Sequence, residues 1–150
     1  MIEARRTSVW SSGYELELNG EPLATFERSV WRGGGRFVMG GRPYEVTSNL
    51  WASSYTLVAG DGATVATARR VGRKDWTIEA DRVVYTFRRA SVWRQEEELT
   101  LGGQPVGSVR RTSSWGGGAV ADLPGMPPVV AVFAVAVVLT TWDLAAASAT

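Results

Sequence analysis

Apolar and polar residues alternate in short runs along most of this chain. Tyr14, Leu16 and Leu18 alternate with Glu15 and Glu17, for example. A period of two places alternate side chains on opposite faces of a strand, and it predicts strands with one covered face and one solvated face. About twelve such strands are expected. Their expected ranges are roughly 4–10, 13–18, 22–28, 36–39, 42–48, 53–59, 63–70, 75–79, 82–89, 94–101, 104–111 and 117–121.

Short turn sequences separate several of these runs. Asn19-Gly20 is the strongest two-residue hairpin signal, and Gly40-Gly41, Gly102-Gly103 and Ala80-Asp81 stand where further tight turns are expected. Two glycine-rich stretches, Gly33-Gly34-Gly35 and Gly116-Gly117-Gly118, are interpreted as flexible connections, because neither is followed by the Gly-Lys-Ser/Thr of a phosphate-binding loop.

The strand pattern repeats along the chain. Arg5-Arg6-Thr7-Ser8-Val9-Trp10 recurs as Arg88-Arg89-Ala90-Ser91-Val92-Trp93, and a weaker copy, Ser48-Asn49-Leu50-Trp51, lies midway. The three tryptophans are therefore about 42 residues apart, a spacing typical of a repeated supersecondary unit. Three copies of one unit account for the chain up to about residue 120. We interpret the repeated serine–tryptophan steps mainly as packing and strand ends, with a lipid interface or a sugar surface as the alternative.

A long apolar run follows the last strand. Residues 129–139 are uninterruptedly hydrophobic, and Pro124, Pro127 and Pro128 precede them. Proline is favoured in the first helical turn, so a helix over about 128–147 is predicted. The strictly apolar part is shorter than the roughly 20 residues of a membrane span, which favours a helix buried in the protein. A membrane tail anchor or a buried strand remains the alternative.

Strands and helix together predict a mainly β fold, an antiparallel barrel of about twelve strands that encloses the C-terminal helix. A barrel of about eight strands is filled by side chains and one of sixteen leaves a channel, so an intermediate barrel has room for a helix of roughly 10 Å diameter. All 150 residues would then form a single domain. The alternative is a β-trefoil with a C-terminal appendage.

This architecture resembles the tubby C-terminal-like superfamily, which includes the tubby domain, the phospholipid scramblases and the LURP-one-related proteins. The resemblance rests on the triplicate strand pattern, the break at Leu123-Pro124-Gly125 and the apolar run from Val129 to Leu139. It implies a twelve-stranded barrel closed around a hydrophobic helix. It also implies association with anionic phospholipid headgroups in some members and scrambling-related roles in others.

The amino-acid composition limits the kinds of functional site that this chain could form. The chain has 16 basic and 15 acidic residues, no histidine and no cysteine. Disulfides and thiolate metal sites are therefore excluded, and the commonest general base is missing. The balanced charge does not indicate a nucleic-acid partner. The first residues lack an apolar signal core, so a cytoplasmic protein, peripheral to a membrane at most, is expected. We also expect a monomer without cofactor, metal or membrane span.

Basic residues recur at one place in the repeat and are the candidate binding residues. If the repeats are equivalent in structure, these residues gather at one end of the barrel, where arginines could bind phosphate oxygens bidentately. The alternative is that they are solvated strand ends paired with nearby glutamates. The candidates are Arg28, Arg69, Arg70, Arg73, Lys74, Arg110 and Arg111.

No arrangement of residues indicates catalysis. Glu96, Glu97 and Glu98 could offer oxygens to calcium, but consecutive residues of a strand point to opposite faces and cannot all converge. The sequence therefore predicts a non-enzymatic binding module, with anionic phospholipid or a protein as its partner. A scramblase-like lipid-handling protein or a structural domain is the alternative.

Overall fold

The computed structural model describes residues 1–7, 13–29, 34–91, 95–112 and 117–148. They form twelve strands and one helix. The strands are β1 (Ile2–Arg6), β2 (Gly13–Leu18), β3 (Glu21–Arg28), β4 (Gly34–Met39), β5 (Arg42–Ser48), β6 (Ser54–Ala59), β7 (Thr64–Arg69), β8 (Asp75–Ala80), β9 (Val83–Ser91), β10 (Glu96–Leu101), β11 (Gln104–Arg111) and β12 (Ala119–Asp122), and the helix is α1 (Pro128–Ser148).

The strands form one closed antiparallel barrel in which sequence neighbours are also neighbours in space. The first and last strands close it, with Ile2 opposite Ala121 and Ala4 opposite Ala119. Closure removes the exposed strand edges that an open sheet would present. The predicted barrel is confirmed and the trefoil alternative is wrong, because the repeats continue around a single sheet.

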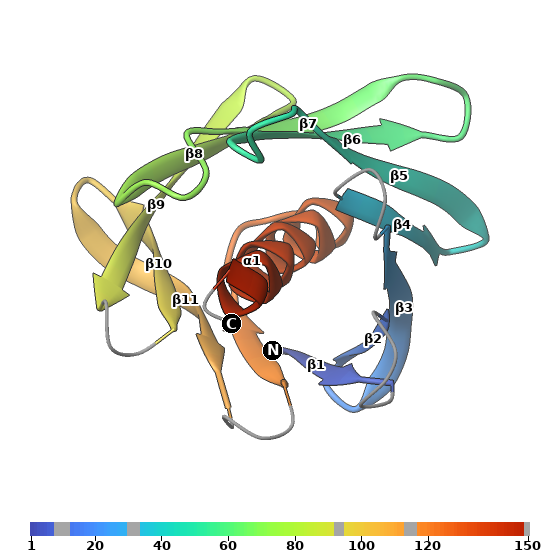
Figure 1. Ribbon diagram of the computed structural model, residues 1–150, viewed down its shortest axis with the longest axis horizontal. Helices are drawn as coiled ribbons and strands as arrows, with labels where there is room; N and C mark the ends of the chain where they lie inside the picture. Colours follow the sequence, from blue (N-terminus) through green and yellow to red (C-terminus); the bar gives the residue numbers. More distant parts are fainter. Residues whose placement is uncertain (8–12, 30–33, 92–94, 113–116, 149–150) are drawn as a thin grey trace.

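Helix α1 runs through the middle of the barrel (Figure 1). Every residue from Val130 to Leu139 is buried, so the helix is covered on all sides. It is long and apolar enough to span a membrane, and 67% of its most apolar stretch is buried inside the protein. In the structure the helix is therefore the core of the barrel, as predicted, and the strand alternative is wrong.

Inward-facing strand side chains complete this core. Among the largest are Tyr14, Phe26, Tyr55, Trp76 and Phe87, and each is at most 2% exposed. The ring of Trp76 stacks on Phe87, with 4.4 Å between ring centroids. The small residues of the helix, Ala131, Ala134 and Ala136, leave space for such large strand side chains.

The two ends of the barrel differ. At one, which we call the turn end, four of the hairpins between consecutive strands are two-residue turns. Positive φ angles at both turn residues, such as 51° at Asn19 and 86° at Gly20, identify type I′ turns. The predicted turns at 19–20, 40–41 and 102–103 are confirmed, and the fourth lies one residue later than expected, at Asp81 and Arg82.

At the other end, the loop end, the odd-numbered strands finish and the even-numbered strands begin. Helix α1 starts at the turn end and reaches the loop end with its last turns, since Asp143 contacts the final residues of β1 and β3. Trp10 and Trp93 of the sequence repeat lie outside the described residues.

The glycine-rich stretches are not simply flexible connections. Gly34 and Gly35 are buried residues of β4, which begins two residues earlier than predicted. A Cβ atom on Gly34 would overlap the carbonyl oxygen of Val46 on the neighbouring strand, and Gly34 has a φ of 82°. Gly117 and Gly118 are also buried, directly before β12. These glycines permit close backbone approach, whereas Gly33 and Gly116 lie outside the described residues.

Candidate functional site

All seven basic residues singled out from the sequence lie at the loop end. Arg28, Arg69 and Arg111 are the last residues of β3, β7 and β11 and are therefore equivalent in the repeat. Arg110 precedes Arg111, and Arg70, Arg73 and Lys74 belong to the connection between β7 and β8. Among the other basic residues that the structure describes, only Arg42 and Arg82 are at the turn end. Positive side chains thus concentrate around one mouth of the barrel.

The seven residues do not form one surface. Arg69, Arg70, Arg73, Lys74 and Arg110 are exposed. Arg28 and Arg111, in contrast, turn towards the helix. The guanidinium of Arg111 lies over the ring of Trp142, 4.9 Å from its centroid, and Arg28 Nε is 3.9 Å from Asp143 Oδ2.

Arg28 belongs to a partly buried cluster around Asp143, made of Arg6, Tyr14, Arg28 and Asp143. Arg6 Nη2 donates to Asp143 Oδ1 at 2.9 Å, and the Tyr14 hydroxyl donates to Asp143 Oδ2 at 2.8 Å. The side chain of Asp143 is only 9% exposed. The cluster connects the last turns of α1 to β1, β2 and β3. The first role of Arg28 is therefore to stabilise the fold.

This environment strongly raises the pKa of the Tyr14 hydroxyl. Burial first, and then the negative charge and hydrogen bond of Asp143, raise the pKa of Tyr14 to about 12. Both effects disfavour the tyrosinate, which would be buried next to a carboxylate. Tyr14 therefore remains a neutral hydrogen-bond donor across the physiological range.

The connection between β5 and β6, residues 49–53, carries the most exposed large apolar side chains among the described residues. Leu50 is 90% exposed and Trp51 is 81% exposed. We call these two residues the apolar tip.

The backbone that carries the apolar tip is well fixed. Asn49 Oδ1 accepts hydrogen bonds from the backbone N–H groups of Ser53 and Ser54, at 2.9 and 3.1 Å. The Ala52 N–H donates to the Asn49 carbonyl at 3.1 Å. These bonds form a closed turn, as is common for asparagine side chains. The apolar tip is thus held away from the protein by its own hydrogen-bond network.

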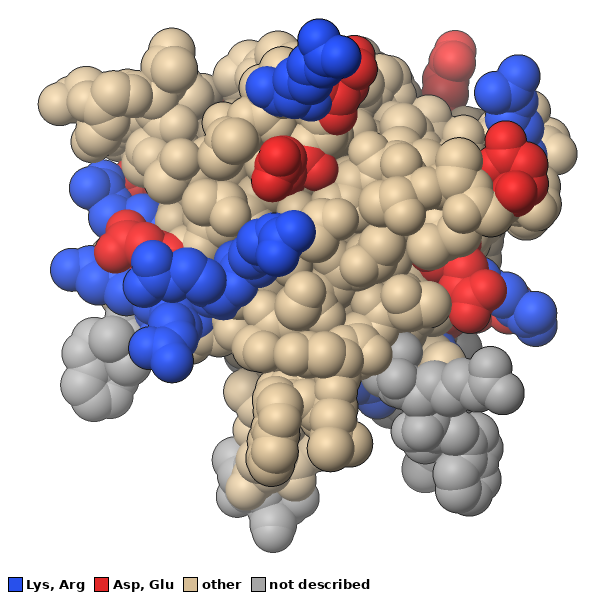
Figure 2. Space-filling model, turned by 90° about the horizontal axis from the view of Figure 1, so that it is seen from above, with Lys and Arg blue, Asp and Glu red and all other residues tan. Residues whose placement is uncertain are grey.

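The apolar tip adjoins a basic segment. In the connection between β7 and β8, residues 70–74, Val71 is buried while Arg70, Arg73 and Lys74 are exposed. The Val71 N–H donates to the Ser53 carbonyl at 2.9 Å, which joins this basic connection to the connection that carries the tip. On the face seen in Figure 2, Lys and Arg side chains gather on one side, towards the end from which uncharged side chains project.

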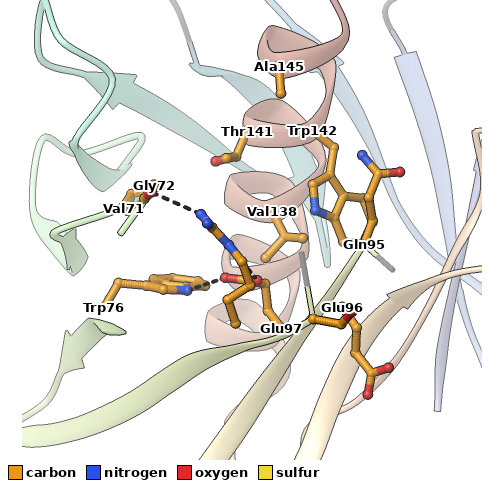
Figure 3. A pocket seen from close by; sticks show the side chains of 12 residues that line it. Val71, Gly72, Trp76, Gln95, Glu96, Glu97, Val138, Thr141, Trp142 and Ala145 are labelled. Atoms are coloured by element: carbon orange, nitrogen blue, oxygen red, sulfur yellow. Dashed lines mark hydrogen bonds and ion pairs between the residues drawn. The ribbon is translucent and has the colours of Figure 1, made fainter. Parts of the chain in front are cut away.

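A pocket of about 260 Å³ opens beside the helix at the loop end. Figure 3 shows Val138, Thr141 and Trp142 of α1 on one side of it and Trp76 and Glu97 of the barrel on the other. We call it the mouth pocket. Sequence reasoning did not find it, because its walls come from separate strands and from the helix.

The acidic run at the start of β10 divides between the two faces, as predicted. Glu97 points into the mouth pocket, where its Oε1 accepts a 2.7 Å hydrogen bond from Trp76 Nε1. Glu98 pairs with Arg88 at 3.6 Å. Burial raises the pKa of Glu97 above its ordinary value, while the Trp76 hydrogen bond and Arg89 act in the opposite direction. Across the described ranges, no three acidic residues converge as metal ligands.

The sequence did not predict the Asp143 cluster, although two of its residues, Asp143 and Arg6, are unusual in the sequence. Asp143 is the only charged residue within the long C-terminal apolar segment, and Arg6 belongs to the repeated Arg-Arg motif. A lone charge in a core helix needs a partner. The identity of that partner depends on the barrel register, which the sequence does not specify.

Comparison with known proteins finds no matching family model, no matching curated protein and no matching solved structure.

Proposed function

We propose that this protein is a non-enzymatic binding module whose loop end docks on membranes that carry anionic phospholipids. The observation that carries the proposal is the pairing of the apolar tip with the basic connection. A leucine and a tryptophan are held in solvent on one connection, which is hydrogen-bonded to a second connection that carries three exposed cations.

Each part of this surface suits one layer of a membrane. Tryptophan is favoured at the level of the headgroups, where its ring has apolar and polar surroundings, and leucine gains by entering the acyl boundary. Basic residues near an anionic leaflet contribute about 1 kcal/mol each. The fixed backbone of the apolar tip lowers the entropy cost of insertion, because the side chains are already presented.

Co-sedimentation of the full chain with vesicles tests the proposal. Vesicles of phosphatidylcholine alone are compared with vesicles that also contain phosphatidylserine, at low and at high salt. We expect binding to the acidic vesicles that weakens at high salt, because exposed charges are screened. Equal binding to both vesicle types, or none to either, would refute it and direct attention to a protein partner.

A pair of charge reversals localises the contact. Arg70→Glu with Arg73→Glu should weaken binding to acidic vesicles by at least about 30-fold, given about 1 kcal/mol per basic residue and tenfold per 1.4 kcal/mol. Arg42→Glu with Arg82→Glu makes the same change in charge at the turn end and should have little effect. Arg70 and Arg82 also share a positive φ, so the two variants carry similar backbone strain.

The apolar tip is tested separately. Leu50→Ser with Trp51→Ser should weaken binding at both salt concentrations, because insertion of apolar side chains is not screened. If this variant still binds the vesicles as tightly, the contact with the membrane is purely electrostatic.

A further inference from the structure

The mouth pocket contains two opposite charges that face each other without a direct hydrogen bond. Glu97 Oε2 lies 4.0 Å from Arg89 Nε, which is beyond hydrogen-bonding distance. The carboxylate is largely enclosed, with 12% of the side chain exposed, and the guanidinium is 37% exposed. Such a separation leaves both groups able to accept a ligand.

Each charged group is held in place by a neutral partner. Trp76, itself only 2% exposed, donates its indole N–H to Glu97 Oε1 at 2.7 Å. Arg89 Nη2 donates to the Gly72 carbonyl at 2.9 Å (Figure 3). One carboxylate oxygen and most of the five guanidinium N–H groups therefore keep their hydrogen-bonding capacity for a ligand.

These groups define the charge of the ligand. A purely anionic molecule would approach the Glu97 carboxylate, and a purely cationic one would approach Arg89. A zwitterion satisfies both, with a positive group at Glu97 and an oxyanion at Arg89. Trp142 and the exposed Ala145 of the pocket wall offer apolar surface to the carbon atoms between the two charges.

The size of the pocket limits the ligand further. About 260 Å³ is at the lower end of the range for small-molecule sites, which suits a group of headgroup size. Arginine binds phosphate oxygens with geometric specificity. We propose that the mouth pocket binds the phosphoethanolamine group, with the ammonium at Glu97 and the phosphate at Arg89.

This group has two sources, the free compound and the headgroup of phosphatidylethanolamine. The lipid source rests on the membrane docking proposed above, whereas the free compound does not. The pocket opens beside the basic connection, since Val71 and Gly72 form part of its wall. A headgroup could therefore reach it from a docked membrane.

Calorimetric titration of the full chain tests the proposal. The ligands are O-phosphoethanolamine and its hydroxyl analogue, ethylene glycol phosphate, which has the phosphate without the ammonium. We expect saturable binding of O-phosphoethanolamine, at least about tenfold tighter than the analogue, as one charge-assisted hydrogen bond provides. Absence of saturable binding at millimolar concentration, or equal affinity for both ligands, would overturn it.

Two matched pairs of variants locate the site. Glu97→Gln keeps the shape of the side chain and an oxygen for the Trp76 indole, and should abolish the preference for the ammonium compound. Arg89→Gln should weaken both ligands by about tenfold or more. Glu98→Gln and Arg88→Gln remove the neighbouring 3.6 Å pair and should leave both affinities unchanged. A preference that survives Glu97→Gln, or that Glu98→Gln removes equally, would contradict the assignment.

Vesicles then distinguish the two sources. Binding to phosphatidylcholine vesicles that increases with added phosphatidylethanolamine, and that Glu97→Gln abolishes, would assign the lipid headgroup. Binding of soluble O-phosphoethanolamine without this increase would assign the free compound. If acidic vesicles fail to bind while O-phosphoethanolamine binds, membrane docking is refuted and the pocket assignment stands.

Discussion

At the scale of single residues, the hydrogen bonds of Asp143 show how this barrel holds a polar group next to an apolar core. Its carboxylate accepts from Arg6 and from Tyr14, and Arg28 lies nearby. A buried carboxylate without such partners would be strongly destabilising. The same arrangement should make the free energy of unfolding decrease at alkaline pH.

Tyr14 should make the protein less stable at high pH. Its pKa in the folded state is about 12, above the ordinary value of 10.0. The folded state therefore holds this proton more tightly, and the resulting stability is fully present below pH 10 and lost as pH rises towards 12. The loss should be about 2 to 3 kcal/mol in the free energy of unfolding, measured by urea titration at several pH values.

Asp143→Asn provides the control for this pH dependence. Removing the charge should lower the pKa of Tyr14, which an absorbance titration of tyrosinate would detect. It should also reduce the free energy of unfolding at neutral pH by about 2 kcal/mol, as for loss of a hydrogen-bonded charge. Glu17→Gln, which removes the half-buried partner of the exposed Arg5 side chain, should cost less than about 1 kcal/mol.

The tight approach of β4 to β5 should make Gly34 sensitive to substitution. Gly34→Ala adds a Cβ atom against the Val46 carbonyl and also strains a positive φ. Gly41 has a similar φ of 75°, but no atom lies within 4 Å of its added Cβ. Gly41→Ala should cost about 1 to 2 kcal/mol, and Gly34→Ala clearly more. Equal losses in thermal unfolding would show that the close contact contributes nothing.

At the scale of elements, α1 replaces the layer of side chains that fills smaller barrels. An all-apolar helix surface has no preferred face, so the barrel has to cover it completely. The Asp143 cluster fixes the helix at its loop end, and the indole of Trp142 adds a cation–π contact with Arg111. Helix position is thus set by polar contacts at one end and by packing elsewhere.

Phe133→Ala should strongly destabilise the protein. Phe133 lies in α1 and is fully buried, at 0% exposure, so its truncation leaves a cavity that close-packed neighbours cannot fill. The expected loss is about 3 to 5 kcal/mol in the free energy of unfolding, measured with urea. Leu144→Ala, in the same helix but at 37% exposure, should cost about 1 kcal/mol or less. A small effect of Phe133→Ala would contradict the role of α1 as the core.

At the scale of the whole molecule, periodicity predicted the barrel because two-residue alternation and tight turns are local properties. The twelve strands follow from them, and the helix starting at Pro128 follows from the apolar run and the prolines before it. The buried glycines of β4 did not, because their role depends on the distance between strands. Gathering of the basic residues at one end followed from the repeat, but the inward turn of Arg28 and Arg111 did not. That difference depends on where α1 ends relative to β3 and β11.

The position of α1 in the sequence has a consequence for biosynthesis. All twelve strands precede the helix, and β1 pairs with β12. A growing chain therefore exposes apolar strand faces and two unpaired edges until the helix has left the ribosome. Contacts between residues so distant in sequence form slowly, and incomplete sheets of this kind tend to aggregate. Protection by chaperones during synthesis should therefore matter more for this protein than its modest size would suggest.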